Sequence, residues 1–183
     1  MSGKKYDLIV CGGSLAGLSA AVRAKELGVE HVLVLEKMKF LGGCAKLAGG
    51  IYAVDSPAQQ RLGLHYVPDD CFKGHMDINN WDCDVKLVGR WQHRTGDSIR
   101  WLEEKGCVFT KVLNFSGEKR FYHMTDKPTG NTIIKTMIDE CERLGVEILL
   151  ETPAKHLIMD GGRAVGVCAE HDGEKLEFYG GNV

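Results

Sequence analysis

Three small residues near the amino terminus have the spacing of a turn that binds a pyrophosphate. Gly12, Ser14 and Gly17 follow a short apolar run and stand where a helical pattern opens. Glycines in such a turn let phosphate oxygens approach the backbone, and the free N–H groups of the helix start carry a partial positive charge. The usual pattern is G-x-G-x-x-G, so Ser14 replaces the middle glycine. Its hydroxyl could donate a hydrogen bond to a phosphate oxygen.

A carboxylate stands at the next place where a dinucleotide site requires one. Glu36 lies 22 residues after Ser14, at the end of a second apolar run, HVLVL. An acidic side chain at this position accepts hydrogen bonds from ribose hydroxyls and repels a 2′-phosphate. The pattern therefore favours FAD or NAD over NADP. The alternative interpretation of Glu36 is a solvated charge at a strand end.

Two glycine pairs follow this carboxylate. Gly42-Gly43 and Gly49-Gly50 lie seven residues apart in the run GGCAKLAGGIYA. Binding of NAD does not need them. A flat flavin ring does, because main-chain N–H groups can reach its polar edge and the pyrophosphate only if the backbone comes close. The pairs favour FAD, and a mobile glycine loop is the alternative.

The elements that must position these residues form a βαβ unit over residues 6–36. We expect a strand over 6–11, a helix over 15–27 that ends at Gly28, and a buried parallel strand over 31–35. A second amphipathic helix over 130–144, with Gly145 after it, leads into a third apolar strand. This order of elements predicts an α/β fold.

The other segments predict helices, short strands and a terminal ribbon. Residues 54–68 are expected to be irregular and 69–106 helical, with Asp82 as an N-cap. Short strands are expected over 107–112 and 119–123, with Arg120 and His123 facing outward; an active-site pair is the alternative for these two residues. The final β-ribbon is predicted to have strands at 156–159, 164–170 and 176–179, and the third parallel strand at 146–150.

Composition excludes several classes of protein. The 183 residues are 44% hydrophobic and 26% charged, with a net charge of -2 and both signs interspersed, so we expect no nucleic-acid partner. No apolar run is long enough to span a membrane, and a cytoplasmic location is the default. The seven cysteines have no zinc-site spacing, so we expect reduced thiols and no metal.

Taken together, VCGGSLAGLSAA, VLVLEK and GGCAKLAGGI resemble the FAD-binding start of the fumarate reductase and succinate dehydrogenase flavoprotein family, which includes L-aspartate oxidase and ketosteroid dehydrogenases. The resemblance runs along the whole chain. It implies an incomplete Rossmann-like FAD/NAD(P)-binding fold of the glutathione-reductase type. Residues 1–183 would be the N-terminal portion of one FAD-binding domain, with a mostly helical insertion at 53–125 and a β-ribbon at 152–183.

The resemblance also implies which residues bind FAD. The pyrophosphate would lie on the turn, Glu36 would hold the adenosine ribose with Lys37 beside it, and Ala154 would contact the adenine through its backbone. The turn residues are Gly12, Gly13, Ser14, Leu15 and Ala16, and those at the flavin end are Gly42, Gly43, Cys44, Leu47, Ala48, Gly49 and Gly50.

One departure from the family concerns how FAD is attached. Membrane-bound members attach it through a histidine just before the second glycine pair, and Gly43 corresponds to that position here. The loop has no histidine, so non-covalent FAD is expected. Attack of Cys44 on the flavin is the alternative to a packing role for this small residue.

The family continues with a buried strand, an ATGG-like turn and a substrate-capping domain, none of which we expect within residues 1–183. We therefore expect that a central strand is missing from the sheet and that its unpaired edge promotes self-association or binding of a partner.

The implied full-length parent is an FAD-dependent oxidoreductase. It would move a hydride between the flavin and a C–C bond that a carboxylate or carbonyl activates in a small-molecule substrate. No catalytic residue can be named within this chain, and the isolated chain is expected to be inactive. The alternatives are a non-catalytic nucleotide-binding fragment, an FAD-dependent monooxygenase, which also uses GGS-x-AG turns, and an NAD-dependent dehydrogenase.

Overall fold

The computed structural model describes residues 5–114 and 121–183. The chain divides into two compact units, Met1–Lys46 with Ile134–Val183, and Leu47–Ile133. Each unit is described by itself. No helix in the described ranges is long and apolar enough to cross a membrane.

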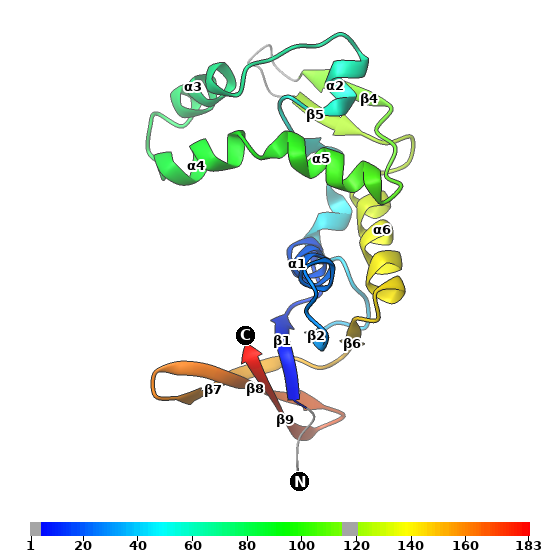
Figure 1. Ribbon diagram of the computed structural model, residues 1–183, viewed down its shortest axis with the longest axis vertical. Coiled ribbons are helices and arrows are strands. Elements are labelled where there is room, and N and C mark those ends of the chain that lie inside the picture. Colours follow the sequence, from blue (N-terminus) through cyan, green and yellow to red (C-terminus); the bar gives the residue numbers. More distant parts are fainter. Residues whose placement is uncertain (1–4, 115–120) are drawn as a thin grey trace. The chain divides into compact units, whose positions relative to one another are not determined.

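A six-stranded sheet forms the first unit, in the order β6-β2-β1-β9-β8-β7 (Figure 1). Its parallel part pairs β1 with β2 and β2 with β6, and its antiparallel part pairs β8 with both β7 and β9. This arrangement confirms the predicted α/β fold and the ribbon. The strands are β1 (Lys5–Cys11), β2 (Val32–Leu35), β6 (Glu147–Leu149), β7 (Ala154–Asp160), β8 (Arg163–His171) and β9 (Glu174–Asn182).

The strand β9 continues beyond the ribbon. It pairs in parallel with β1, with Tyr6 opposite Gly180 and Leu8 opposite Asn182. The prediction that the last strand ends at Tyr179 was wrong, because β9 continues to Asn182. The physical reason is a close approach, because a Cβ on Gly180 would lie 3.0 Å from Ile9 Cδ1. Gly180 thus lies where β9 packs against β1.

Helix α1 (Leu15–Glu26) and the sheet form the core of this unit. Leu18, Ala21 and Val22 of the helix are fully buried, and every residue of β2 is buried, as expected of a parallel strand covered on both faces. One buried cluster joins the parallel strands to the ribbon through Tyr6, Ile9, Leu33, Leu35, Val167 and Ala169. The helix predicted near 130–144 is α6 (Thr129–Arg143), and it buries Met137 and Cys141.

The second unit combines short helices with a three-stranded sheet in the order β3-β5-β4. The 3-10 turn η1 (Gly43–Leu47) precedes it in the chain. Its helices are α2 (Pro57–Arg61), α3 (Pro68–Ile78), α4 (Val85–Gln92) and α5 (Thr95–Glu104), and its strands are β3 (Ile51–Tyr52), β4 (Lys111–Asn114) and β5 (Phe121–Met124).

Two predictions about where the helices of this unit begin were wrong. The segment 54–68 is not irregular throughout, because Ser56 caps α2. Its Oγ accepts from the Gln59 N–H, and Gln59 Oε1 accepts from the Ser56 N–H, both at 3.1 Å. The N-cap of α4 is Asp84, which accepts from the Leu87 N–H at 2.9 Å, and not Asp82.

The strands of this unit also differ from the prediction. Strand β4 begins at Lys111 and not at Cys107. His123 on β5 does not face outward, because its side chain is fully buried and hydrogen-bonded to Ser56. Arg120, which we expected beside it, lies outside the described residues.

Candidate cofactor site

The turn between β1 and α1 leaves open space beside its first glycine. The Gly12 N–H donates to the Leu35 carbonyl at 2.8 Å, which ties the end of β1 to the end of β2. Gly12 has a φ of +114°, and no atom lies within 4 Å of the place where a Cβ would be. Glycine supplies both this backbone conformation and the room for a ligand to reach the backbone.

Gly17 brings α1 against the same turn. A Cβ on Gly17 would lie 1.9 Å from the Gly12 carbonyl oxygen and 3.1 Å from Val10 Cγ1. Only a glycine therefore lets the first turn of the helix rest on the strand, which is the role of the third glycine in a dinucleotide turn.

Ser14 stands at the N-cap of α1 but does not cap it. Its backbone is extended, with φ -77° and ψ 178°, and its side chain makes no capping hydrogen bond. The first turn of α1 contains no acidic residue. The N–H groups of Leu15 and Ala16 begin a helix whose positive end has no carboxylate of its own helix to neutralise it. This helix start, with the Ser14 hydroxyl, can bind an anion.

The side chain of Glu36 lies under the turn. It is only 7% exposed. Oε2 accepts from the Gly13 N–H at 2.7 Å, and Oε1 accepts from the Met38 N–H at 2.8 Å. A carboxylate has about four lone-pair positions, so two bonds leave further acceptor capacity on each oxygen. The acid is held in one orientation and can still accept from hydroxyls.

A pocket of about 280 Å³ opens beside this carboxylate. The Thr152 N–H donates to the Glu36 carbonyl at 2.8 Å and holds the start of β7 against the end of β2. The predicted residues Gly12, Glu36, Lys37 and Ala154 therefore meet at one place. The complete lining is Cys11, Gly12, Leu35, Glu36, Lys37, Pro153 and Ala154.

Sequence reasoning missed three residues of this lining. Cys11 and Leu35 are the last residues of β1 and β2, so their position next to predicted residues was the available signal. Pro153 carried no signal, because only the tertiary fold brings it to the turn. Burial raises the pKa of the Cys11 thiol, so this side chain presents a neutral group to the pocket.

The first glycine pair lies against the turn. The Gly42 N–H donates to the Gly13 carbonyl at 2.8 Å, and Ser14 and Gly42 form a parallel β-bridge. Gly42 and Gly43 both have positive φ, +105° and +50°. Cys44 follows in η1 with an exposed side chain. The predicted residues Gly42 and Gly43 therefore extend the surface that Gly13 and Ser14 begin.

The second glycine pair belongs to the second unit, as do Leu47 and Ala48. The Ala48 carbonyl accepts from the Gly130 N–H at 2.9 Å. A Cβ on Gly50 would lie 3.1 Å from Tyr122 Cβ, whereas Gly49 has nothing within 4 Å of its Cβ position. Leu47 is 87% exposed. Gly50 is thus fixed by close packing on β5, and Gly49 borders open space.

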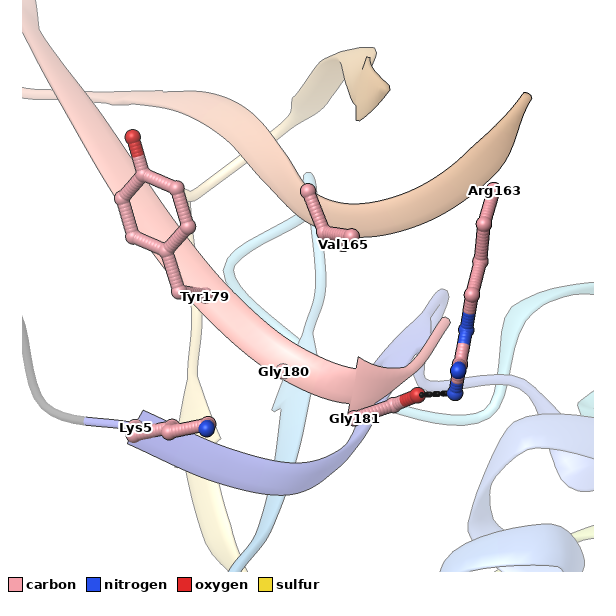
Figure 2. Close-up of a pocket in the computed structure, with 6 residues that line it drawn as sticks. All are labelled: Lys5, Arg163, Val165, Tyr179, Gly180 and Gly181. Atoms are coloured by element: carbon pink, nitrogen blue, oxygen red, sulfur yellow. Dashed lines mark hydrogen bonds between the residues drawn. The ribbon is translucent and has the colours of Figure 1, made fainter. Parts of the chain in front are cut away.

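A further pocket of the first unit, about 330 Å³, lies at the other end of β1. Figure 2 shows Lys5, Val165 and Tyr179 around it, with the Arg163 side chain reaching the Gly181 carbonyl at 2.5 Å. In open α/β sheets, ligands bind outside the carboxyl ends of the parallel strands. Lys5 begins β1 and Gly12 follows its end. A nucleotide is therefore expected in the pocket of about 280 Å³ that Gly12 and Glu36 line, which we call the Gly12 pocket.

Comparison with known proteins identifies the ligand of this type of turn. A family model described as "FAD binding domain" matches residues 7–182. The open glycine turn, the uncapped helix start and the buried acid fit the pyrophosphate and ribose of FAD.

Two curated relatives and one solved structure are similar to most of the chain. Vinyl phenol reductase of Lactiplantibacillus plantarum is 28% identical over 85% of this chain and 32% of its own length. NADH:fumarate oxidoreductase of Klebsiella pneumoniae is 26% identical over 94% of this chain and 19% of its own length. An open conformation of a flavocytochrome c3 fumarate reductase superposes with a TM-score of 0.91 at 23% identity, over 97% of this chain and 32% of that chain. The chain thus spans about a third or less of each.

Proposed function

From the premise that the chain belongs to the FAD binding domain family, we propose that it holds the FAD of a flavoprotein oxidoreductase of the fumarate reductase type. The observation that carries this proposal is the Gly12 pocket. A glycine with an open Cβ position, a buried acid with spare acceptor capacity and the start of β7 meet there. These are the groups that a pyrophosphate, a ribose and an adenine require.

Each predicted residue has a role in this proposal. The N–H groups of Leu15 and Ala16 and the Ser14 hydroxyl bind the pyrophosphate, and Gly12 and Gly13 leave it room beside the backbone. Glu36 accepts from the ribose hydroxyls, and Lys37 adds a positive charge at the rim. The backbone of Ala154 contacts the adenine. Gly42, Gly43 and Cys44, followed by residues 47–50, lie along the flavin end. FAD supplies hydride transfer when bound, and the chain supplies binding and orientation.

The proposed reaction of the whole protein is hydride transfer to or from a C–C bond that a carboxylate or carbonyl activates. The relative named NADH:fumarate oxidoreductase supports this class, because the double bond of fumarate lies between two carboxylates. The relative named vinyl phenol reductase supports only the broader class of C–C double-bond reduction. The substrate is a small molecule. We assign no catalytic residue to residues 1–183 and propose that this chain alone binds FAD without turnover.

Three secondary proposals concern attachment, association and location. FAD is held non-covalently, because residues 42–50 contain no histidine. Self-association uses a sheet edge, and β7 supports this because Leu157 and Met159 are about half exposed on it, at 52% and 54%. The protein acts in the cytoplasm, which the seven free cysteines support.

Reconstitution tests the proposed function. The purified chain is mixed with FAD, passed through a desalting column and examined for the visible absorbance band of flavin. We expect flavin to elute with the protein and to be released into the supernatant by acid. Flavin that stays in the acid precipitate would contradict non-covalent attachment. Protein that elutes colourless after mixing with FAD would contradict the proposal itself.

A further inference from the structure

The first three residues that follow the second glycine pair are bound to β5 through their backbone. Ile51 and Tyr52 form β3 and pair with His123 and Tyr122. The Ala53 N–H then donates to the Phe121 carbonyl at 3.1 Å. We call residues 51–56 the anchored segment. It begins directly after Gly50. Contacts that hold this segment in place therefore also hold the end of the glycine loop.

Alternate residues of the anchored segment each bind a polar side chain that lies outside the segment. The Gln92 amide donates to the Tyr52 hydroxyl at 2.6 Å, and the Val54 N–H donates to Thr95 Oγ1 at 3.0 Å. Ser56 Oγ and His123 Nε2 are hydrogen-bonded at 2.6 Å. The three partners come from the end of α4, the start of α5 and β5. They thus fix one segment from three directions.

Close packing adds a fourth constraint. A Cβ on Gly96 would lie 2.4 Å from the Asp55 carbonyl oxygen and 2.7 Å from the Val54 carbonyl oxygen. The start of α5 therefore rests directly on the backbone of the anchored segment. Asp55 has a φ of +55°, a conformation that few residues other than glycine adopt. The segment is held in one backbone conformation.

The polar side chains that hold this segment are buried and, in the part of the chain that the structure describes, two of them each carry an unpaired atom. Gln92 and His123 are fully buried, and Thr95 is 4% exposed. Within the described residues, Gln92 Oε1 and His123 Nδ1 have no hydrogen-bond partner. Burying such atoms unpaired lowers stability, and apolar residues of similar size would avoid this cost. Their position points to control of the segment's conformation.

The constraint reaches the glycine pair through Gly50. A Cβ on Gly50 would lie 3.1 Å from Tyr122 Cβ and 3.2 Å from the His123 carbonyl oxygen, so Gly50 packs on the same two residues of β5 that pair with β3. Gly49 borders open space. We infer that Gln92, Thr95 and His123 are positioning residues that act through the anchored segment to hold Gly49 and Gly50 where the flavin ring binds. This inference rests on the proposed function.

Two matched pairs of variants test the inference. Thr95→Val keeps the shape and removes the acceptor of the Val54 N–H, whereas Thr95→Ser keeps the hydroxyl. His123→Leu removes the bond to Ser56, whereas the amide of His123→Gln can restore it. Affinities for FAD and for ADP are measured for each chain, because ADP carries the adenosine and pyrophosphate without the flavin. The melting temperature of each variant shows whether it folds. If one pair fails to fold, the other pair alone tests the inference.

We expect Thr95→Val and His123→Leu to bind FAD about tenfold more weakly than the unchanged chain, the value of one buried hydrogen bond. Their ADP affinity should not change, and Thr95→Ser and His123→Gln should bind FAD normally. FAD affinity that is unchanged in Thr95→Val and His123→Leu would overturn the inference, as would parallel losses for FAD and ADP. An unchanged chain that binds neither ligand would instead overturn the proposed function, and this inference with it.

Discussion

The Glu36 carboxylate and the Gly13 N–H lie 2.7 Å apart, so the acid that follows β2 also closes the turn that follows β1. The second carboxylate oxygen accepts from the Met38 N–H at 2.8 Å. Glu36 therefore shapes the protein before any ligand arrives. The orientation of its free lone pairs is set by the two backbone groups that occupy the others.

Replacing Glu36 with glutamine tests this double role. In Glu36→Gln, one of the two N–H groups meets an amide NH₂ in place of an acceptor, so a buried donor is left unpaired. We expect the free energy of unfolding to fall by about 1–3 kcal/mol and FAD to bind at least about tenfold more weakly. Urea denaturation and FAD titration measure the two effects. Glu30→Gln, at an exposed position in the same unit, is the control and should change neither.

Gly17→Ala tests the contact between α1 and the turn. The new Cβ would lie 1.9 Å from the Gly12 carbonyl oxygen, a backbone atom that cannot move without distorting the turn. Alanine favours a helix, so propensity alone predicts a gain in stability. We expect the steric effect to dominate, with a loss of about 1–3 kcal/mol in the free energy of unfolding and loss of FAD binding. A variant more stable than the unchanged chain would contradict the observed packing.

Gly49→Ala is the matched substitution at an open position. No atom lies within 4 Å of its Cβ position. The added methyl group should therefore change the free energy of unfolding by less than about 0.5 kcal/mol. It occupies space proposed for the flavin, so FAD affinity should fall while ADP affinity stays the same. Equal FAD affinity in this variant would exclude Gly49 from the flavin site.

Substitutions at two exposed lysines distinguish the effect of a charge beside the cofactor site from the effect of the net charge on FAD affinity. Lys37 borders the Gly12 pocket, and Lys5 borders the pocket at the opposite end of β1. Lys37→Ala should weaken FAD binding a few-fold, and less so at high salt, because screening reduces the attraction between exposed charges. Lys5→Ala removes the same charge and should leave the affinity unchanged. Equal losses in both variants would show that only the net charge matters.

The parts of the fold that depend on local sequence could be predicted. The parts that depend on how closely distant segments pack could not. The strand, turn and helix around Gly12 depend on apolar runs and glycine spacing, and they form as expected. The pairing of β9 with β1 depends on how closely Gly180 can approach Ile9. The sequence does not contain that distance, so the predicted strand stops at Tyr179, one residue before Gly180.

The candidate site divides in the same way. Glu36 could be predicted because strand length and spacing place it at a strand end. Ala154 entered only through the family resemblance, and it does line the pocket. The burial of His123 could not be predicted, because alternation in a short strand does not show which face is covered. Its partner Ser56 is distant in sequence.

The buried side chain of His123 predicts how stability depends on pH. Burial lowers the pKa of His123 from 6.5 to about 4 in the folded chain. Between these values the unfolded chain binds more protons, so the free energy of unfolding falls as the pH decreases from 6.5 toward 4 and levels off below. The loss should be roughly 3 kcal/mol. Urea denaturation at several pH values measures it, and His123→Gln should lose this part of the slope. Identical slopes in both chains would assign the pH dependence to other groups.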